Sequence, residues 1–223
     1  MLHGSHILKS FDKDLTKMNN YLISISQLVI EELYITLSYF NNNKQENIIS
    51  EIFKIEEKIN EISQKSLDLT IEIFTLRSPV AWDLRYVFAA SQMTRSLERN
   101  GDNIKKAMKD IYGLTSKDAD LDKQVIIMLE KNITMHNIAL NAFIKQDISL
   151  ANITEIRDDE IDKAFSSLCN LLLQKIQREP EKLNSFYNYL FLGRRLERIG
   201  DNISSIRTFI AFIETGTFTE EKL

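Results

Sequence analysis

The sequence predicts an all-α protein that consists of two tandem antiparallel three-helix bundles related by an internal duplication. Three observations point to this fold class: few turn-forming residues, apolar residues at helical spacing, and a repeated helical phrase. The 223 residues contain only six glycines and two prolines, too few for the turns of a many-stranded fold. Hydrophobic residues make up 43% of the chain, which is sufficient for a substantial core.

The repeated phrase reads SLERNGDNIKKA from Ser96 and RLERIGDNISSI from Arg195. When the copies are aligned from Arg95 and from Arg194, eight of the ten positions that end at an isoleucine are identical. The two copies lie 99 residues apart, roughly half the chain length. This spacing indicates a duplicated unit, each copy of which ends in the repeated phrase.

The first half predicts three helices. An amphipathic stretch covers about residues 6–40 and stops at the polar run that begins at Asn41. A third helix covers about 80–112, and Pro79 suits its first turn. Between them, a seam advances by alternate steps of four and three residues with one polar exception. Its members are Ile48, Ile52, Ile55, Ile59, Ile62, Ser66, Leu69, Ile73 and Leu76.

The second half predicts three more helices. The stretch GLTSKDAD from Gly113 combines a glycine with small polar residues and interrupts the apolar rhythm. We therefore expect a first repeat at 1–112, a connecting segment at 113–120, a second repeat at 121–223, and helices at about 118–146, 149–178 and 181–213. Helices near 30 residues are roughly 45 Å long, which suits an elongated bundle. Short polar breaks favour helices that fold back on one another over a long coiled coil.

Composition also excludes several classes of protein. The net charge of −4 and the lack of a Lys/Arg run argue against nucleic-acid binding. The single cysteine, Cys169, excludes a disulfide framework and favours a reducing compartment. We expect no membrane insertion, because the sequence has neither an apolar core of signal-peptide length nor a run of about 18 apolar residues. These features predict a soluble cytoplasmic chain.

The repeated phrase places carboxylates away from an apolar stripe. In the last helix, Glu197 and Asp201 lie about 40° apart around the helix axis and more than about 120° from the centre of the stripe. Glu98 and Asp102 have the same places in the first copy. The stripe comprises Tyr189, Leu192, Leu196, Ile199, Ile203, Ile206 and Ile210 in the last helix, and Met93, Leu97, Ile104 and Ile111 in the first copy. Asn100 is the exception, because it takes the stripe position that Ile199 fills.

Paired carboxylates four residues apart repel each other unless a cation lies between them. The alternative is a solvated face, on which nearby arginines balance the acids; these are Arg95, Arg99, Arg194 and Arg198. Gly101 and Gly200 favour the site, because a glycine inside a helix costs roughly 1 kcal/mol relative to alanine. A glycine at this place in both copies indicates that close packing or a ligand excludes a side chain.

The middle helix of each half supplies further oxygen donors. Glu56 and Asn60 in the first half match Asp158 and Asp162 in the second, and antiparallel packing would bring them to the paired acids of the last helix. A donor set of oxygens alone favours hard cations such as Mg²⁺, Mn²⁺ or iron over structural zinc. The three histidines, His3, His6 and His136, form no Glu-x-x-His pair, which argues against a ferritin-like di-iron oxidase. His136 is interpreted as an interfacial or surface residue.

Together these residues resemble the PhoU family of phosphate-uptake regulators. The resemblance covers nearly the whole chain. Its motifs are a start with His6, Phe11 and Leu15, the stretch RSPVAWDLR from Arg77 to Arg85, and the paired LERNGD and LERIGD. It implies two tandem three-helix bundles that bind metal, often as multinuclear iron or zinc clusters, with manganese or magnesium also open. The ligands it implies are Glu98, Asp102, Glu197 and Asp201, joined less directly by Glu56, Asn60, Asp158 and Asp162.

The resemblance also implies a function and partners. Such a protein restrains phosphate import and the phosphate-starvation response when phosphate is sufficient. Its partners would be the ATPase subunit of a phosphate ABC transporter, a membrane sensor histidine kinase, and a second copy of the chain in a homodimer. No catalytic activity is implied.

The sequence departs from the family pattern at four asparagines. Asn103 and Asn202 stand where the family often has histidine, Asn60 replaces an acid, and Asn100 replaces an apolar residue. Because the first half lacks one anionic ligand, we expect it to bind metal less tightly than the second.

Two other functions remain open at the level of sequence. A metal-dependent phosphohydrolase could use the same carboxylates, but the sequence offers no nucleophile or histidine base beside them. A metal-free helical adaptor is the third possibility. In RSPVAWDLR, we expect Trp82 and Leu84 to pack at a helix start where Asp83 favours the first turn; alternatively, Arg85 belongs to a partner surface.

Overall fold

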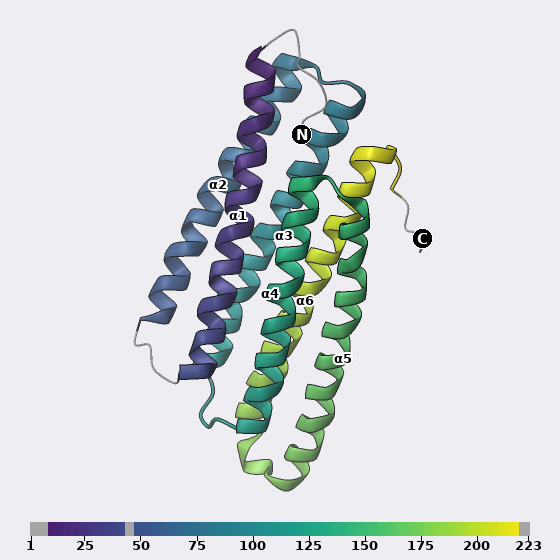
Figure 1. Ribbon diagram of the computed structural model, residues 1–223. Coiled ribbons are helices and arrows are strands. Elements are labelled where there is room, and N and C mark those ends of the chain that lie inside the picture. The colour runs from purple at the N-terminus through teal and green to yellow at the C-terminus, as the bar shows by residue number, and fades with distance from the viewer. Residues whose placement is uncertain (1–8, 43–46, 219–223) are drawn as a thin grey trace.

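The computed structural model describes residues 9–42 and 47–218, and its elements are all helical (Figure 1). They are α1 (Lys9–Asn42), α2 (Ile48–Arg77), α3 (Ala81–Tyr112), α4 (Ala119–Lys145), α5 (Ile148–Arg178), the 3-10 turn η1 (Pro180–Lys182) and α6 (Leu183–Thr215). No strand occurs in the described part of the chain. The predicted all-α fold and the predicted order of six long helices are confirmed. His3 and His6 lie outside the described residues.

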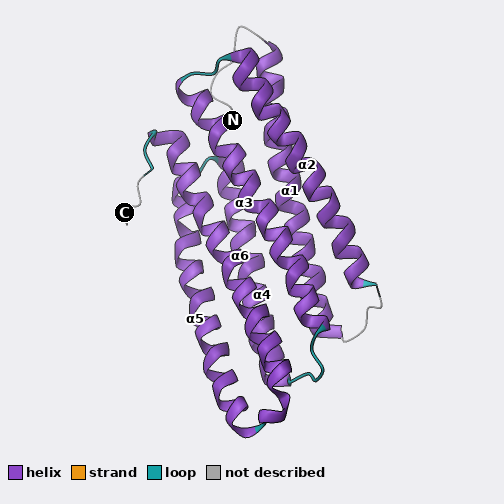
Figure 2. Ribbon diagram, turned by 180° about the vertical axis from the view of Figure 1, so that it is seen from behind, coloured by secondary structure: helices purple, strands orange, loops and turns teal. Residues whose placement is uncertain are grey.

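The helices form two three-helix bundles that lie side by side. Each of α1, α2 and α3 contacts the other two, and so does each of α4, α5 and α6. Across the two halves α3 packs against α6, the most extensive helix contact of the fold, and α1 packs against α4 (Figures 1 and 2). The two helices that carry the repeated phrase therefore form the centre of the molecule and run antiparallel to each other (Figure 1).

The predicted apolar stripes form the core. All seven stripe residues of α6 are buried, and so are the four named on α3. Most of the α2 seam is buried as well, including Ser66, whose hydroxyl lies 3.4 Å from that of Thr94. Leu76 is exposed, contrary to the prediction, because it lies in the last turn of α2, just before Ser78 adopts a left-handed conformation (φ 47°) and ends the helix. None of the described helices combines the length and apolar character needed to cross a bilayer.

The start of α3 is tied to the end of α6. The ring of Trp82 stacks on that of Tyr86, with centroids 5.1 Å apart, as expected for a packed helix start. Leu84 is exposed, so its predicted packing is wrong. The guanidinium Nε of Arg85 donates to the carbonyl oxygen of Ile213 at 2.9 Å, which satisfies a carbonyl in the last turn of α6.

Candidate metal centre

The second half brings three carboxylates together between α5 and α6. One oxygen each from Asp162, Glu197 and Asp201 lies within 4.8 Å of the others. Asp158 precedes Asp162 by one helical turn and is close enough to the acids of α6 that Asp201 is a main electrostatic influence on it. The antiparallel packing of the middle and last helices thus assembles acids that lie 39 residues apart in the sequence.

Asp162 and Asp201 are exposed, whereas Glu197 is partly buried. Arg194 donates to Oε1 of Glu197, whereas Oε2 is buried without a hydrogen-bond partner. The apolar stripe of α6 had predicted that Glu197 points outward. Its side chain is only 12% exposed, so it does not face open solvent. The difference arises because Arg194, on the same helix, and Asp162, on the neighbouring α5, lie beside the Glu197 carboxylate. Burial raises the pKa of Glu197, and the nearby charge of Asp201 raises it further.

Asp158 is the most perturbed acid of this group. Burial, followed by the charges of Asp201 and Asp162, raises the pKa of Asp158 to about 7, and a hydrogen bond from Ser204 opposes this shift. Its Oδ1 atom is buried without a hydrogen-bond partner. Two desolvated carboxylate oxygens without donors, one on Glu197 and one on Asp158, are ligands that a hard cation would take. The residues of the second half therefore fit a metal ion.

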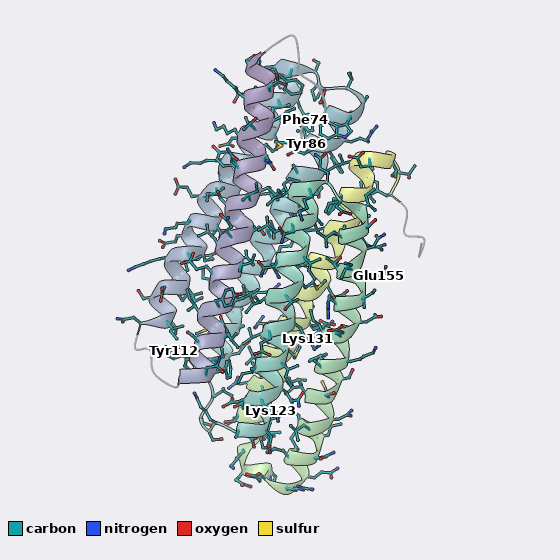
Figure 3. All side chains as sticks on the ribbon, in the orientation of Figure 1. Phe74, Tyr86, Tyr112, Lys123, Lys131 and Glu155 are labelled. Carbon is teal, nitrogen blue, oxygen red and sulfur yellow. The ribbon has the colours of Figure 1, made fainter. Side chains whose placement is uncertain are left out.

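Two other acids of α5, Glu155 and Glu160, differ from this group because each has a cationic partner. Lys131 of α4 pairs with Glu160 at 2.7 Å, and Glu155 pairs with Arg207 at 3.4 Å. Figure 3 labels Lys131 on α4 and Glu155 on α5. Asp158 and Asp162 instead meet the acids of α6, which separates the candidate site from these ion pairs.

The first half arranges the corresponding residues in another way. Glu56 is buried, and both of its oxygens are occupied: Oε1 accepts from Nδ2 of Asn60 at 2.6 Å, and Oε2 accepts from Nζ of Lys105 at 2.8 Å. Asp102 pairs with Lys106 at 3.2 Å. Burial, then the charge of Asp102, raises the pKa of Glu98. This donor set fits a metal less well, because protein donors already neutralise its most buried carboxylate.

Glu32 of α1 is a buried acid that the sequence analysis missed. Its side chain is fully buried, and neither carboxylate oxygen has a hydrogen-bond partner. Burial, followed by the charge of Glu56, raises the pKa of Glu32 to about 9, so the carboxyl is neutral at pH 7. A signal was present: the seam of α1 steps through Leu15, Met18, Leu22, Ile25, Val29, Glu32 and Thr36 by threes and fours, and its last two members are polar.

The glycine of each repeated phrase allows close packing at its cluster. A Cβ atom on Gly101 would lie 3.0 Å from Cδ1 of Ile59 and 3.3 Å from Oε2 of Glu32. A Cβ atom on Gly200 would lie 3.0 Å from Oδ1 of Asp158. The predicted close packing at these positions is confirmed, and in both halves the nearby groups include a carboxylate.

Asn100 occupies the junction between the two halves. Its Nδ2 lies 3.2 Å from Nε2 of His136 and 3.4 Å from the carbonyl oxygen of Ile199, and its Oδ1 accepts from Asn202 at 2.8 Å. His136 is fully buried, and its Nδ1 donates to the carbonyl of Asn132 at 2.9 Å, which leaves Nε2 as the acceptor for Asn100. Burial lowers the pKa of His136 to about 4. The interpretation of His136 as interfacial is confirmed.

A polar groove joins the two clusters across this junction. It has a volume of about 400 Å³ and lies between α3 and α6. Its lining comprises Arg99, Asp102, Asn103, Lys106, Arg198, Asp201 and Asn202. One acid of each repeated phrase therefore borders the same groove, with one arginine from each copy beside it.

Comparison with known proteins identifies the family. The family model described as PhoU domain matches residues 22–111 and 125–210, one match in each helical half. The chain belongs to the PhoU family. Among curated PhoU proteins, the phosphate-specific transport system accessory protein PhoU homolog of Clostridium acetobutylicum is 27% identical, over 93% of this chain and 95% of its own length. The homolog of the same name from Borreliella burgdorferi is 28% identical, over 94% and 97%.

Solved PhoU structures have the same fold. The crystal structure of PhoU from Pseudomonas aeruginosa superposes with a TM-score of 0.83 at 22% identity and covers 93% of this chain and 100% of its own. The PhoU structure from Streptococcus pneumoniae, described as a phosphate transport system regulatory protein, gives 0.80 at 24% identity and covers 95% and 100%. These similarities establish that the PhoU arrangement of six helices is present in this chain.

Proposed function

We propose that this PhoU-family chain is a non-catalytic accessory regulator of a phosphate-specific transport system. The observation that carries the proposal is the pair of PhoU-domain matches, which span both helical halves and align the chain with relatives named as accessory proteins of such systems. The long helices offer an extended surface for protein partners. The function is restraint of phosphate uptake and of the starvation response when phosphate is abundant.

Metal binding belongs to this proposal and is assigned first to the second half. Asp162, Glu197 and Asp201 would hold the ion, with Asp158 as a further donor. A bound cation such as iron, zinc, manganese or magnesium would neutralise these carboxylates and link α5 to α6. Support comes from the convergence of three carboxylate oxygens within 4.8 Å and from the unpartnered oxygens of Glu197 and Asp158.

The proposed partners are the ATPase subunit of the phosphate transporter and a membrane sensor histidine kinase, with the chain acting as a cytoplasmic homodimer. A metal-dependent hydrolase would need a general base beside the carboxylates. The one histidine in the described residues, His136, is instead buried at the junction between the halves and bonded to Asn100 and Asn132. His136 therefore cannot serve as a general base at the metal centre.

The proposal is tested in the cells that encode the chain. Deletion of its gene is expected to raise phosphate uptake during growth in abundant phosphate, and the wild-type gene should restore restraint. A gene with Asp201→Asn should restore it poorly, because the substitution removes a charged oxygen from the candidate metal centre.

The matched control is Asp159→Asn, which removes an exposed carboxylate on α5. It should restore restraint fully. Unchanged phosphate uptake after deletion, together with no transporter subunit co-purifying with the chain, would contradict the proposed function. If the Asp201→Asn gene complements as well as the wild-type gene, only the proposed role of the metal is contradicted.

A further inference from the structure

We propose that Lys105 acts as an internal cation in the first half, so that its ammonium group takes the place a metal ion would take and metal binding is confined to the second half. This inference rests on the metal centre proposed above. It concerns the chain's own residues, and it explains why two nearly identical repeated phrases would have different binding properties.

The first step is the position of the Lys105 ammonium group. It projects from α3 across the groove to α2, where its Nζ lies 2.8 Å from Oε2 of Glu56 and 4.9 Å from the centre of the Phe53 ring. The other oxygen of Glu56 accepts from Asn60. A cation that approached Glu56 would have to displace both donors, so the carboxylate is already satisfied by the protein.

The second step is the burial of this ion pair. The side chains of Lys105 and Glu56 are 24% and 6% exposed, whereas those of Lys106 and Asp102 are 49% and 43% exposed. An exposed pair contributes little and is easily replaced by water. A largely desolvated pair behaves differently, because removal of one member leaves an uncompensated buried charge. Lys105 is therefore a built part of the first cluster and not a surface lysine that happens to lie nearby.

The third step is the acid that this cluster holds without a partner. The fully buried carboxyl of Glu32 has no hydrogen bond, and it lies next to Gly101, close enough to Glu56, Asp102 and Lys105 for their charges to act on it. The first half therefore gathers acids from three helices around one site. Glu56 is the buried charged member of this group, and Lys105 brings the positive charge that balances it.

The fourth step is the comparison with the second half. The repeat spacing of 99 residues places Ser204 where the first half has Lys105, and the match between the middle helices places Asp162 where it has Asn60. Ser204 reaches Asp158, the counterpart of Glu56, but brings no charge. The second half thus has one more carboxylate and one fewer cation at corresponding positions. These two differences determine which half needs an ion from solution.

The experiment transplants those two positions. The full-length chain is freed of metal with a chelator and titrated with Mn²⁺ alone, with binding followed by calorimetry and by metal analysis after gel filtration. Wild-type protein should lose at least about tenfold in affinity on Asp201→Asn and should be unaffected by Asp102→Asn. The double variant Asn60→Asp with Lys105→Ser should gain a second class of sites that disappears when Asp102→Asn is added.

Lys109→Ser is the matched control, because Lys109 is exposed on the same helix and lies 6.0 Å from the same Phe53 ring. It should gain no site. If the double variant unfolds, Lys105→Gln replaces it, since the amide keeps a hydrogen-bond donor but removes the charge. If a Lys105 variant gains Mn²⁺ binding and this gain requires Asp102, the inference is supported. Absence of Mn²⁺ binding by wild-type protein would count only against the metal centre of the second half.

Two results would overturn the inference. One is equal loss of Mn²⁺ affinity in wild-type protein on Asp102→Asn and on Asp201→Asn, which would mean that Lys105 leaves the first half open to metal. The other is a folded Lys105 variant with no additional Mn²⁺ binding, whether or not the second half binds the ion. Melting curves provide an independent readout, because added Mn²⁺ should raise the melting temperature of the double variant more than that of wild-type protein.

Discussion

The acidic cluster between α2 and α3 and the acidic cluster between α5 and α6 occupy corresponding places in the two bundles, but their carboxylates are balanced in different ways. In the first cluster Glu56 receives hydrogen bonds from Asn60 and Lys105. In the second, Asp162, Glu197 and Asp201 converge on one another, and some of the oxygens there remain without donors. A duplicated helix phrase thus preserves packing more strictly than it preserves the chemistry of the acidic cluster beside it.

The difference arises outside the identical part of the repeat. The positions that set it are 60 and 162 on the middle helices and 105 and 204 just after the repeated phrase. The apolar stripe and the glycine are retained in both halves because the helices must approach each other closely in each bundle. Side chains at the rim of the groove carry no such constraint, so the two sites are free to diverge.

The largest expected effect is on the pH dependence of stability, to which one buried acid of each half contributes differently. The pKa of Glu32 is raised to about 9 and that of Asp158 to about 7, so each stabilises the fold most at low pH, and this stability is lost as the pH rises toward those values. We expect Glu32→Gln to raise the free energy of unfolding at pH 8 by about 4 kcal/mol. Asp158→Asn should raise it by only about 1 kcal/mol, because that carboxyl is partly solvated.

Urea unfolding between pH 5 and pH 9 in the presence of a chelator measures both effects. The Glu32→Gln variant should show a flatter pH profile over the whole range. The slope of the Asp158→Asn profile should differ from that of wild-type protein mainly below pH 7, and its gain in stability should be constant above pH 7. Identical profiles for Glu32→Gln and wild-type protein would show that this carboxyl is not held neutral in the folded state.

The second effect tests the junction that joins the halves. The pKa of His136 is lowered from 6.5 to about 4, so the unfolded chain takes up a proton before the folded chain does as the pH falls. The free energy of unfolding should therefore decrease by about 3 kcal/mol between pH 6.5 and pH 4 through this residue. Acids with raised pKa values change the free energy of unfolding in the opposite direction. The measured quantity is therefore the difference between wild-type protein and His136→Gln in the slope of this free energy against pH.

Because Asn100 of one half and His136 of the other share a buried hydrogen bond, acid unfolding should disrupt both bundles together. Circular dichroism and tryptophan fluorescence from Trp82 in the first half should follow one transition. Two separated transitions would show that the halves are independent despite their extensive contact along α3 and α6.

The third effect compares the paired acids directly. In separate variants, Asp201→Ala should weaken Mn²⁺ binding by at least about tenfold, equivalent to about 1.4 kcal/mol, because it removes a charged donor from the convergent cluster. Asp102→Ala should not, because Asp102 pairs with Lys106 in a groove that already holds Lys105. Isothermal titration of the two proteins checks the prediction, and equal losses would refute the asymmetry of the halves.

Most of the fold could be predicted from the sequence because its signals are local. Apolar periodicity and short polar breaks together located all six helices, and the bounds of α2 and α5 differ from the predicted ones by no more than a residue or two. The errors lie at helix ends, where Leu76 and Leu84 follow the apolar pattern but have no neighbouring helix to cover them. A periodic pattern identifies the face of a helix but not how far its partner extends.

The candidate site was less predictable because its decisive contacts are distant in sequence. Glu98 with Asp102 and Glu197 with Asp201 were found as neighbours on one helix turn. The contact of Lys105 with Glu56 spans 49 residues, and the approach of Glu32 to both depends on how α1 packs against the other two helices. Residue spacing does not indicate which lysine will contact an acid of another helix. Asn60, by contrast, is visible in the sequence, and it led to the prediction that the first half binds metal less tightly.

The smallest effect on stability, and the last distinction between the halves, concerns the two glycines. Alanine favours a helix over glycine by about 1 kcal/mol, but a methyl group in a filled space costs about 1 to 3 kcal/mol. Gly101→Ala presses on the tip of Ile59 and on Glu32, and Gly200→Ala presses on Ile161 and on Oδ1 of Asp158. Flexible isoleucine tips can yield, so each variant should stay within about 1 kcal/mol of wild-type stability.

Only Gly200→Ala presses on a proposed metal donor, Asp158, so it alone should weaken Mn²⁺ binding. Melting curves with and without Mn²⁺ separate the two quantities, and an equal change in Mn²⁺ binding in both variants would disconnect the glycines from the site.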